Sequence, residues 1–131
     1  MTRDYKTVTN LQLASKQISE IAVENQVFRM MSKLIELNLG GNKIKTIERL
    51  QDLKSLRSLN LTDNLIERIE NLNLPLLQYL YLDRNKITAI NNLNGVKKLE
   101  CLTLAGNKVT SPNLKGSELL VQLNQLDVSD N

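Results

Sequence analysis

The 131-residue sequence predicts an α/β solenoid, a right-handed coil with short parallel strands on its concave face and 3₁₀ or short helical segments on its convex face. The first observation behind this prediction is a recurring frame, L-x-x-L-x-L-x-x-N-x-I-x-x-I, which occupies 34–47, 56–69 and 77–90. A weaker copy lies at 99–109, and a fifth copy begins at Leu123. Self-similarity at a fixed period of about 20–29 residues is typical of solenoids, in which each repeat forms one coil.

The second observation is an asparagine at the same place in each of these copies. Successive asparagines are 22, 21, 22 and 24 residues apart. The side-chain amide both donates and accepts hydrogen bonds, so it can satisfy backbone groups where the chain turns away from each strand. We expect the asparagines to stack as a structural ladder that consists of Asn42, Asn64, Asn85, Asn107 and Asn131.

The third observation is the spacing of the apolar residues. Leu80 and Leu82 are separated by one residue, so on a strand they point to the same side, and Tyr79 and Tyr81 point to the other. Between strands the apolar residues recur at every third position, which suits a 3₁₀ turn better than an α-helix. We therefore expect short 3₁₀ pieces on the convex face.

The frame predicts a single domain over residues 1–131. Residues 1–33 form an N-terminal capping coil with a helix, because apolar residues at 23, 27, 30, 31 and 34 have helical spacing. In that helix Phe28, Met30 and Met31 are expected to cover the first strands. Regular repeats occupy 34–122, and 123–131 is the start of a last, incomplete repeat.

The composition argues against several kinds of catalytic site. The chain has no histidine, so it has neither a Ser-His or Cys-His nucleophile pair nor a zinc site built on imidazole. The carboxylates are spread over separate coils, and Gly40-Gly41 lacks the Lys-Ser or Lys-Thr of a phosphate-binding loop. We expect no enzymatic activity, no cofactor and no metal.

The repeat, with forms such as LNLGGNKIKTIERL at 37–50, resembles the leucine-rich repeat proteins of the 22-residue class. That class is typified by the leucine-rich regulatory subunit of type-1 protein phosphatase; outer-arm dynein light chain 1 and the spliceosomal ribonucleoprotein A-prime are similar. The resemblance covers nearly the whole chain. It implies a protein-binding module that presents its concave face and usually has no catalytic activity.

Placing the copies in one register predicts which side chains share the concave face. Tyr79 and Tyr81, two of the three tyrosines of the chain, lie side by side in the middle. An aromatic pair on a rigid strand loses little entropy on binding and is typical of interaction hot spots. The alternative is that the two rings merely pack on each other. The predicted partner-binding set is Tyr79, Tyr81, Asp83, Arg84, Asp63, Asn60, Glu36, Thr103 and Cys101.

The charges of the concave face differ from those of the whole chain. Five carboxylates against one guanidinium leave that face at −4, whereas the chain carries +3. An Arg or Lys of a partner could lie over a tyrosine ring while its head meets Asp63 or Asp83. We expect a protein partner with a basic segment and no direct nucleic-acid contact there. A rim column of Lys43, Lys86 and Lys108 is interpreted as a solvated edge, with a second contact surface as the alternative.

The predicted function is a protein-protein interaction module with a regulatory or scaffold role, phosphatase-regulator-like or ciliary and cytoskeletal. The alternatives are a ribonucleoprotein component that binds a protein in an RNA particle, and the recognition arm of a larger enzyme. One cysteine cannot form an internal disulfide, which favours a reducing compartment. With no signal peptide or membrane-spanning run in the sequence, we expect a monomeric intracellular protein, cytoplasmic, nuclear or ciliary, without a membrane partner.

Overall fold

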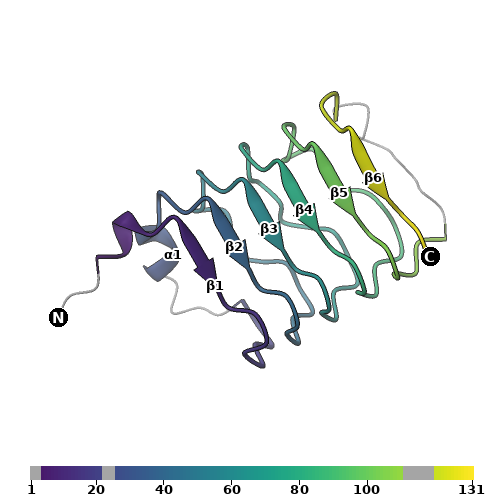
Figure 1. Ribbon diagram of the computed structural model, residues 1–131, viewed down its shortest axis with the longest axis horizontal. Coiled ribbons are helices and arrows are strands. Elements are labelled where there is room, and N and C mark those ends of the chain that lie inside the picture. Colours follow the sequence, from purple (N-terminus) through teal and green to yellow (C-terminus); the bar gives the residue numbers. More distant parts are fainter. Residues whose placement is uncertain (1–3, 22–25, 111–119) are drawn as a thin grey trace.

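The computed structural model describes residues 4–21, 26–110 and 120–131. Six strands of three residues form one parallel sheet, and each strand pairs with the next in the chain, which confirms the predicted solenoid (Figure 1). The strands are β1 (Asn10–Gln12), β2 (Glu36–Asn38), β3 (Ser58–Asn60), β4 (Tyr79–Tyr81), β5 (Cys101–Thr103) and β6 (Gln125–Asp127).

The strands pair in a register that places equivalent positions of the repeat next to each other. The first residues of the strands form one continuous column, which we call the first column, and the third residues form the second column. The first column is Asn10, Glu36, Ser58, Tyr79, Cys101 and Gln125. The second column is Gln12, Asn38, Asn60, Tyr81, Thr103 and Asp127.

The leucines and isoleucines of the frame fill one continuous core. Leu59, Leu61, Leu80 and Leu82 are all 0% exposed. Burying a leucine or isoleucine side chain contributes about 1.5–3 kcal/mol. Because each coil contributes several such residues, the sheet that they support forms a firm base for the side chains on its other face.

The asparagine ladder joins neighbouring coils through buried hydrogen bonds. Asn85 donates from Nδ2 to the carbonyl oxygen of Leu61 in the preceding coil (2.9 Å) and to that of Leu82 in its own coil (3.0 Å). Its Oδ1 accepts from the backbone N–H of Ile66 at 3.0 Å. Equivalent bonds are made by Asn42, Asn64, Asn107 and Asn131.

The turns opposite the strands contain isolated 3₁₀ hydrogen bonds rather than a run of them. Leu53 donates to the carbonyl of Leu50 at 3.0 Å, and Leu56 donates to that of Leu53 at 3.1 Å. A 3₁₀ helix needs such bonds from consecutive residues, whereas here they come from every third residue. Hence the predicted 3₁₀ pieces occur as single turns, and among the described residues only η1 (Tyr5–Thr7), which precedes β1, is a 3₁₀ helix.

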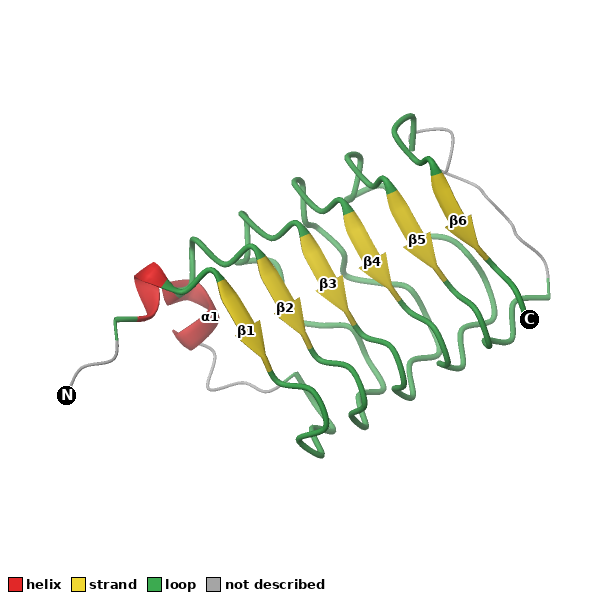
Figure 2. Cartoon of the chain, in the orientation of Figure 1, coloured by secondary structure: helices red, strands yellow, loops and turns green. Residues whose placement is uncertain are grey.

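The predicted N-terminal helix is present as α1 (Gln26–Met30), which lies near the β1 end of the sheet (Figure 2). Phe28 packs against the core and Met31 is 3% exposed, as expected. Met30, however, is 41% exposed, so its expected role in covering the strands is wrong. Residues three apart share a helix face, which puts Met30 on a different face from Phe28 and Met31. Parts of the predicted cap (1–3 and 22–25) and of the regular repeats (111–119) lie outside the described residues.

A second stack of asparagine side chains was not predicted from the sequence. Its members lie seven residues after ladder asparagines. Asn71 and Asn92 adopt left-handed backbone conformations, with φ of 56° and 57°. Asn71 donates to the carbonyl oxygen of Ile47 at 2.8 Å, and Asn92 donates to that of Ile69 at 2.9 Å. Asparagine tolerates this conformation better than most residues. Each of these side chains therefore ties its turn to the preceding coil.

The ladder predicts a large effect of replacing one asparagine. In Asn85→Ala the backbone groups of Ile66, Leu61 and Leu82 lose a buried partner, which costs about 1–3 kcal/mol of unfolding free energy. Chemical denaturation followed by circular dichroism measures this loss. The matched control is Asn91→Ala, since Asn91 is exposed and should change the midpoint little. Equal midpoints for both variants would show that the ladder does not stabilise the fold.

Close packing of two coils predicts that Gly95 does not tolerate a side chain. A Cβ atom built there would lie 2.0 Å from the carbonyl oxygen of Leu72 and 3.0 Å from the Cα atom of Asn73. Gly95→Ala should therefore push the two coils apart and lower the unfolding free energy by about 1–3 kcal/mol. Gly40→Ala is the control, because its nearest contact is 3.2 Å to the side chain of Asn38. A thermal melt that ranks Gly40→Ala below Gly95→Ala would contradict this packing.

Candidate functional site

Tyr79 and Tyr81 lie on the central strand β4 and face away from the core. The side chain of Tyr79 is 38% exposed, and Tyr81 is half-buried. Burial raises the pKa of the Tyr81 hydroxyl, and the neighbouring Cys101 and Tyr79 raise it further. We call the two residues the tyrosine pair. Because the pair shares one strand, its spacing is set by the backbone.

Smaller side chains flank the tyrosine pair on both neighbouring strands. Ser58 and Asn60 lie beside the two tyrosines on β3, and Cys101 and Thr103 lie beside them on β5. Cys101 is 5% exposed and Thr103 is 8% exposed. The structure therefore places both in the predicted columns, but they offer a partner little surface.

Asp63 and Arg84 pair with each other. Arg84 Nε donates to Asp63 Oδ1 at 2.6 Å, and Arg84 Nη2 donates to Oδ2 at 2.7 Å. The hydrogen bond from Arg84 lowers the pKa of Asp63; burial opposes this shift, and the positive charge of Arg84 adds to it. Both residues have left-handed φ values, 55° and 50°. The expectation that Asp63 meets a basic head of the partner stays a prediction, and such a partner would have to share or displace the bonds that Arg84 makes to both oxygens.

Asp83 is also committed within the chain. Its Oδ2 accepts from Thr103 Oγ1 at 2.6 Å, and its Oδ1 accepts from the backbone N–H of Ala105 at 2.8 Å. These bonds fasten the end of β4 to the coil that contains β5. Each oxygen of Asp83 already has a donor, so its principal role in this structure is to connect coils.

Amide side chains and one carboxylate cover the concave face at β1 and β2. Asn38 Nδ2 donates to Gln12 Oε1 at 2.9 Å, and Gln12 Nε2 donates to Asn10 Oδ1 at 2.9 Å. Asn10 in turn donates to the carboxylate of Glu36. Glu36 is exposed and receives only a neutral donor in this network.

Asp127 provides a carboxylate at the other end of the sheet, on β6. Its Oδ1 accepts from the backbone N–H of Ser129 at 2.9 Å. Hydrogen bonds from the backbone and the side chain of Ser129 lower the pKa of Asp127, and burial opposes them only weakly. Asp127 is therefore ionised at neutral pH.

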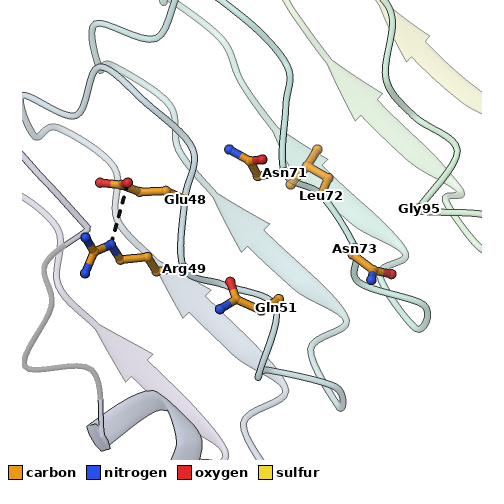
Figure 3. A pocket seen from close by; sticks show the side chains of 7 residues that line it. All are labelled: Glu48, Arg49, Gln51, Asn71, Leu72, Asn73 and Gly95. Carbon is orange, nitrogen blue, oxygen red and sulfur yellow. Dashed lines mark ion pairs between the residues drawn. The ribbon is translucent and has the colours of Figure 1, made fainter.

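An open depression away from the strands is another place where a ligand could bind. It has a volume of about 500 Å³ and is lined by Glu48, Arg49, Gln51, Asn71, Leu72, Asn73 and Gly95 (Figure 3). Glu48 and Arg49 form an ion pair of 3.6 Å with each other, and Asn71 is bonded to Ile47. Since its charged groups neutralise each other, the depression is a weaker candidate than the tyrosine pair.

The described ranges 4–21, 26–110 and 120–131 contain no group of three His, Cys, Asp or Glu residues placed to hold a metal ion. Likewise, none of the helices in these ranges has the length and apolar character that crossing a membrane requires.

The surroundings of Cys101 predict an unreactive thiol. Burial raises its pKa, and the charge of Asp83 raises it further, so the folded protein holds less thiolate at pH 8 than the unfolded chain. Because thiolate is the reacting species, alkylation by iodoacetamide should be at least about tenfold slower in the folded protein. Asp83→Asn, which removes the charge, should speed the reaction. Equal rates in buffer and in denaturant, followed by mass spectrometry, would contradict the burial of Cys101.

Comparison with known proteins identifies the repeat. Residues 6–66 match the family described as Leucine rich repeat, and residues 54–95 match the related description Leucine Rich repeats (2 copies). An uncharacterized leucine-rich repeat-containing protein of Schizosaccharomyces pombe is 34% identical over 93 residues, which are 68% of this chain and 15% of that protein.

Solved structures agree with this match. An internalin from Listeria monocytogenes is 29% identical with a TM-score of 0.73, and the alignment covers 88% of this chain and 33% of that one. The TLR13–ssRNA13 complex has a chain that is 29% identical with a TM-score of 0.78, over 92% of this chain and 18% of that one. This chain thus spans one third or less of each of these relatives.

The fold, the repeat and both family matches agree on a protein whose coils each carry one short strand, followed from β2 onwards by one ladder asparagine. Leucine-rich repeat folds of this kind generally serve as binding modules without enzymatic activity. The chain belongs to the leucine-rich repeat family.

Proposed function

We propose that this chain is a protein-interaction module that binds a partner protein on its concave face, centred on the tyrosine pair. The observation that carries the proposal is an exposed aromatic side chain, Tyr79, on the middle of a sheet that the core and the ladder hold rigid. Leucine-rich repeat proteins are generally protein-interaction modules, and solenoids use extended concave surfaces for binding.

The physical advantage of this arrangement is entropic. A tyrosine has only two side-chain torsions, and a strand fixed on both sides does not need to be ordered when the partner arrives. The ring buries a large apolar area while its hydroxyl can still form a hydrogen bond. Binding energy is therefore expected to concentrate at Tyr79 and Tyr81.

The charge of the concave face supports a partner with a basic segment. Asp63 and Arg84 neutralise each other, which leaves the charges of Glu36, Asp83, Asp127 and Asp130 across the sheet. Carboxylates repel the phosphates of nucleic acids, so direct nucleic-acid binding on this face is disfavoured. A role in a ribonucleoprotein particle would accordingly act through a protein component.

A regulatory or scaffold role, phosphatase-regulator-like or in cilia and the cytoskeleton, belongs to the same proposal, as do a monomeric state and an intracellular location. The single cysteine supports the location, because the chain cannot form a disulfide within itself. A second candidate is the recognition arm of a larger protein such as an enzyme. It is favoured by the fact that the chain spans only 15% of the Schizosaccharomyces pombe relative.

Substitutions of the tyrosine pair test whether the concave face binds the partner. A partner recovered by affinity purification is titrated with the purified chain by isothermal calorimetry. Tyr79→Ala and Tyr81→Ala should each weaken binding by about 2 kcal/mol, as hot-spot residues do. The control variants are Lys43→Ala and Lys108→Ala on the rim, both exposed and expected to bind normally. Full binding by the tyrosine variants together with loss in the lysine variants would place the working surface on the rim.

A further inference from the structure

Three groups that can anchor a ligand lie on every second strand of the sheet. Glu36 is on β2, the tyrosine pair is on β4 and Asp127 is on β6. The intervening strands carry shorter or buried side chains, such as Ser58 on β3 and the 5%-exposed Cys101 on β5. The surface of the sheet therefore alternates between positions that offer a contact and positions that do not.

The separation of these anchors follows from the geometry of the sheet. Neighbouring strands lie about 4.8 Å apart, so two intervals separate the anchors by about 9.6 Å across the sheet, and the shift of two residues along the strands between Glu36 and Asp127 lengthens each step to about 10 Å. The three anchors follow a shallow diagonal, because Glu36 belongs to the first column and Asp127 to the second. The tyrosine pair provides one residue to each column, so the diagonal passes through it.

Glu36 and Asp127, the two carboxylates that lie on strands, are less committed within the chain than Asp63 and Asp83. Asp63 is paired with Arg84, and both oxygens of Asp83 have donors within the chain. Glu36 accepts from one neutral amide, that of Asn10, and Asp127 accepts from Ser129, two residues away in its own coil. Each can therefore still accept a charge-assisted hydrogen bond from Lys or Arg.

A repeat of about 10 Å limits the regular conformations that a ligand can have. In the polyproline II conformation residues i, i+3 and i+6 share one face and are about 9.3 Å apart. A β-strand places residues of one face about 6.7 Å apart, which does not fit. An α-helix places i and i+7 about 10.5 Å apart, so the distance alone admits both the polyproline II conformation and the helix.

Hydrogen bonding distinguishes the extended ligand from the helical one. A polyproline II segment has no internal hydrogen bonds, so its carbonyl groups need donors from the site, whereas those of a helix are already satisfied. The concave face has such donors. They are the hydroxyls of the tyrosine pair and Asn60 Nδ2, which donates to no acceptor among the described residues. Asn60 Oδ1 is occupied by the backbone N–H of Thr62 at 2.9 Å. Aromatic surfaces with such donors are what polyproline II ligands bind in other folds.

We propose that the concave face binds a protein segment in the polyproline II conformation, with Lys or Arg at i and i+6 and a proline or apolar residue at i+3. The two basic residues pair with Glu36 and Asp127, and the central residue packs on the tyrosine pair. This inference rests on the proposed function, since it names the segment that the same concave face recognises. In this inference the carboxylates that bind the basic residues of the partner are Glu36 and Asp127 rather than Asp63 and Asp83.

The test begins with a library of random 16-residue peptides displayed on phage and selected on the immobilised chain, a length that can also hold basic residues fourteen positions apart. Enriched sequences should carry basic residues six positions apart with a proline or apolar residue midway. Selection on Glu36→Gln should remove the preference for a basic residue at one end, and selection on Asp127→Asn should remove it at the other. Glu67→Gln, a change at an exposed carboxylate outside the strands, is the control and should leave both preferences unchanged.

Fluorescence anisotropy with one enriched peptide then measures the spacing. Inserting a single residue between i+3 and i+6 should weaken binding about tenfold, because one of the two charged pairs can no longer form. A helical ligand would instead bind best with basic residues seven or fourteen apart, and that result would overturn the inference. A selection that enriches nothing, or enriches peptides without the spacing, would also overturn it.

Tyr79→Ala separates failure of this inference from failure of the proposed function. If enriched peptides or a natural partner lose affinity for Tyr79→Ala but show no six-residue spacing, the concave face is the binding site and only the polyproline II inference is wrong. If binding is unchanged by Tyr79→Ala, Glu36→Gln and Asp127→Asn together, the partner binds elsewhere and both proposals are wrong.

Discussion

The hydrogen bonds of the ladder asparagines are the constraint on which the rest of the structure depends. Each strand has only three residues, so backbone pairing alone gives few bonds between coils. Asn64 adds bonds to the carbonyl oxygens of Leu39 in one coil and Leu61 in the next, both at 3.0 Å. Because the amide reaches both coils, it sets their separation and their register together. A shift of one residue would move the buried leucines to the concave face.

The fixed register explains why short segments can build a defined binding surface. Once equivalent positions are aligned, a side chain at one frame position always lies beside its counterparts in the neighbouring coils. The tyrosine pair thus gains fixed neighbours on β3 and β5 without any loop having to fold around it. Left-handed residues such as Asp63 and Arg84, which follow the strands, then bring their side chains close enough to pair.

The sequence was sufficient for features that repeat and insufficient for features that occur once. The strands, both columns and the ladder positions follow from the frame, because the same residue type recurs at the same position in successive copies. The pairing of Asp63 with Arg84 and of Asp83 with Thr103 could not be predicted, since it depends on the reach of individual side chains across one coil boundary. The second stack at Asn71 and Asn92 had a detectable signal: the two residues are 21 positions apart, as Asn64 and Asn85 are.

The hydrogen bonds that Asp63 and Asp83 make within the chain also bear on which partner the concave face is proposed to bind. Counted from the sequence, the carboxylates around the tyrosine pair resemble a broad acidic surface that would attract any cation. In the structure Asp63 and Asp83 have donors from Arg84, Thr103 and Ala105, so a partner that used them would first have to displace these bonds. Displacing a bidentate ion pair returns little net energy, because one salt bridge replaces another. In the proposed binding mode, selectivity therefore depends less on the amount of negative charge than on the distance between Glu36 and Asp127, a distance that the ladder and the strand register hold constant.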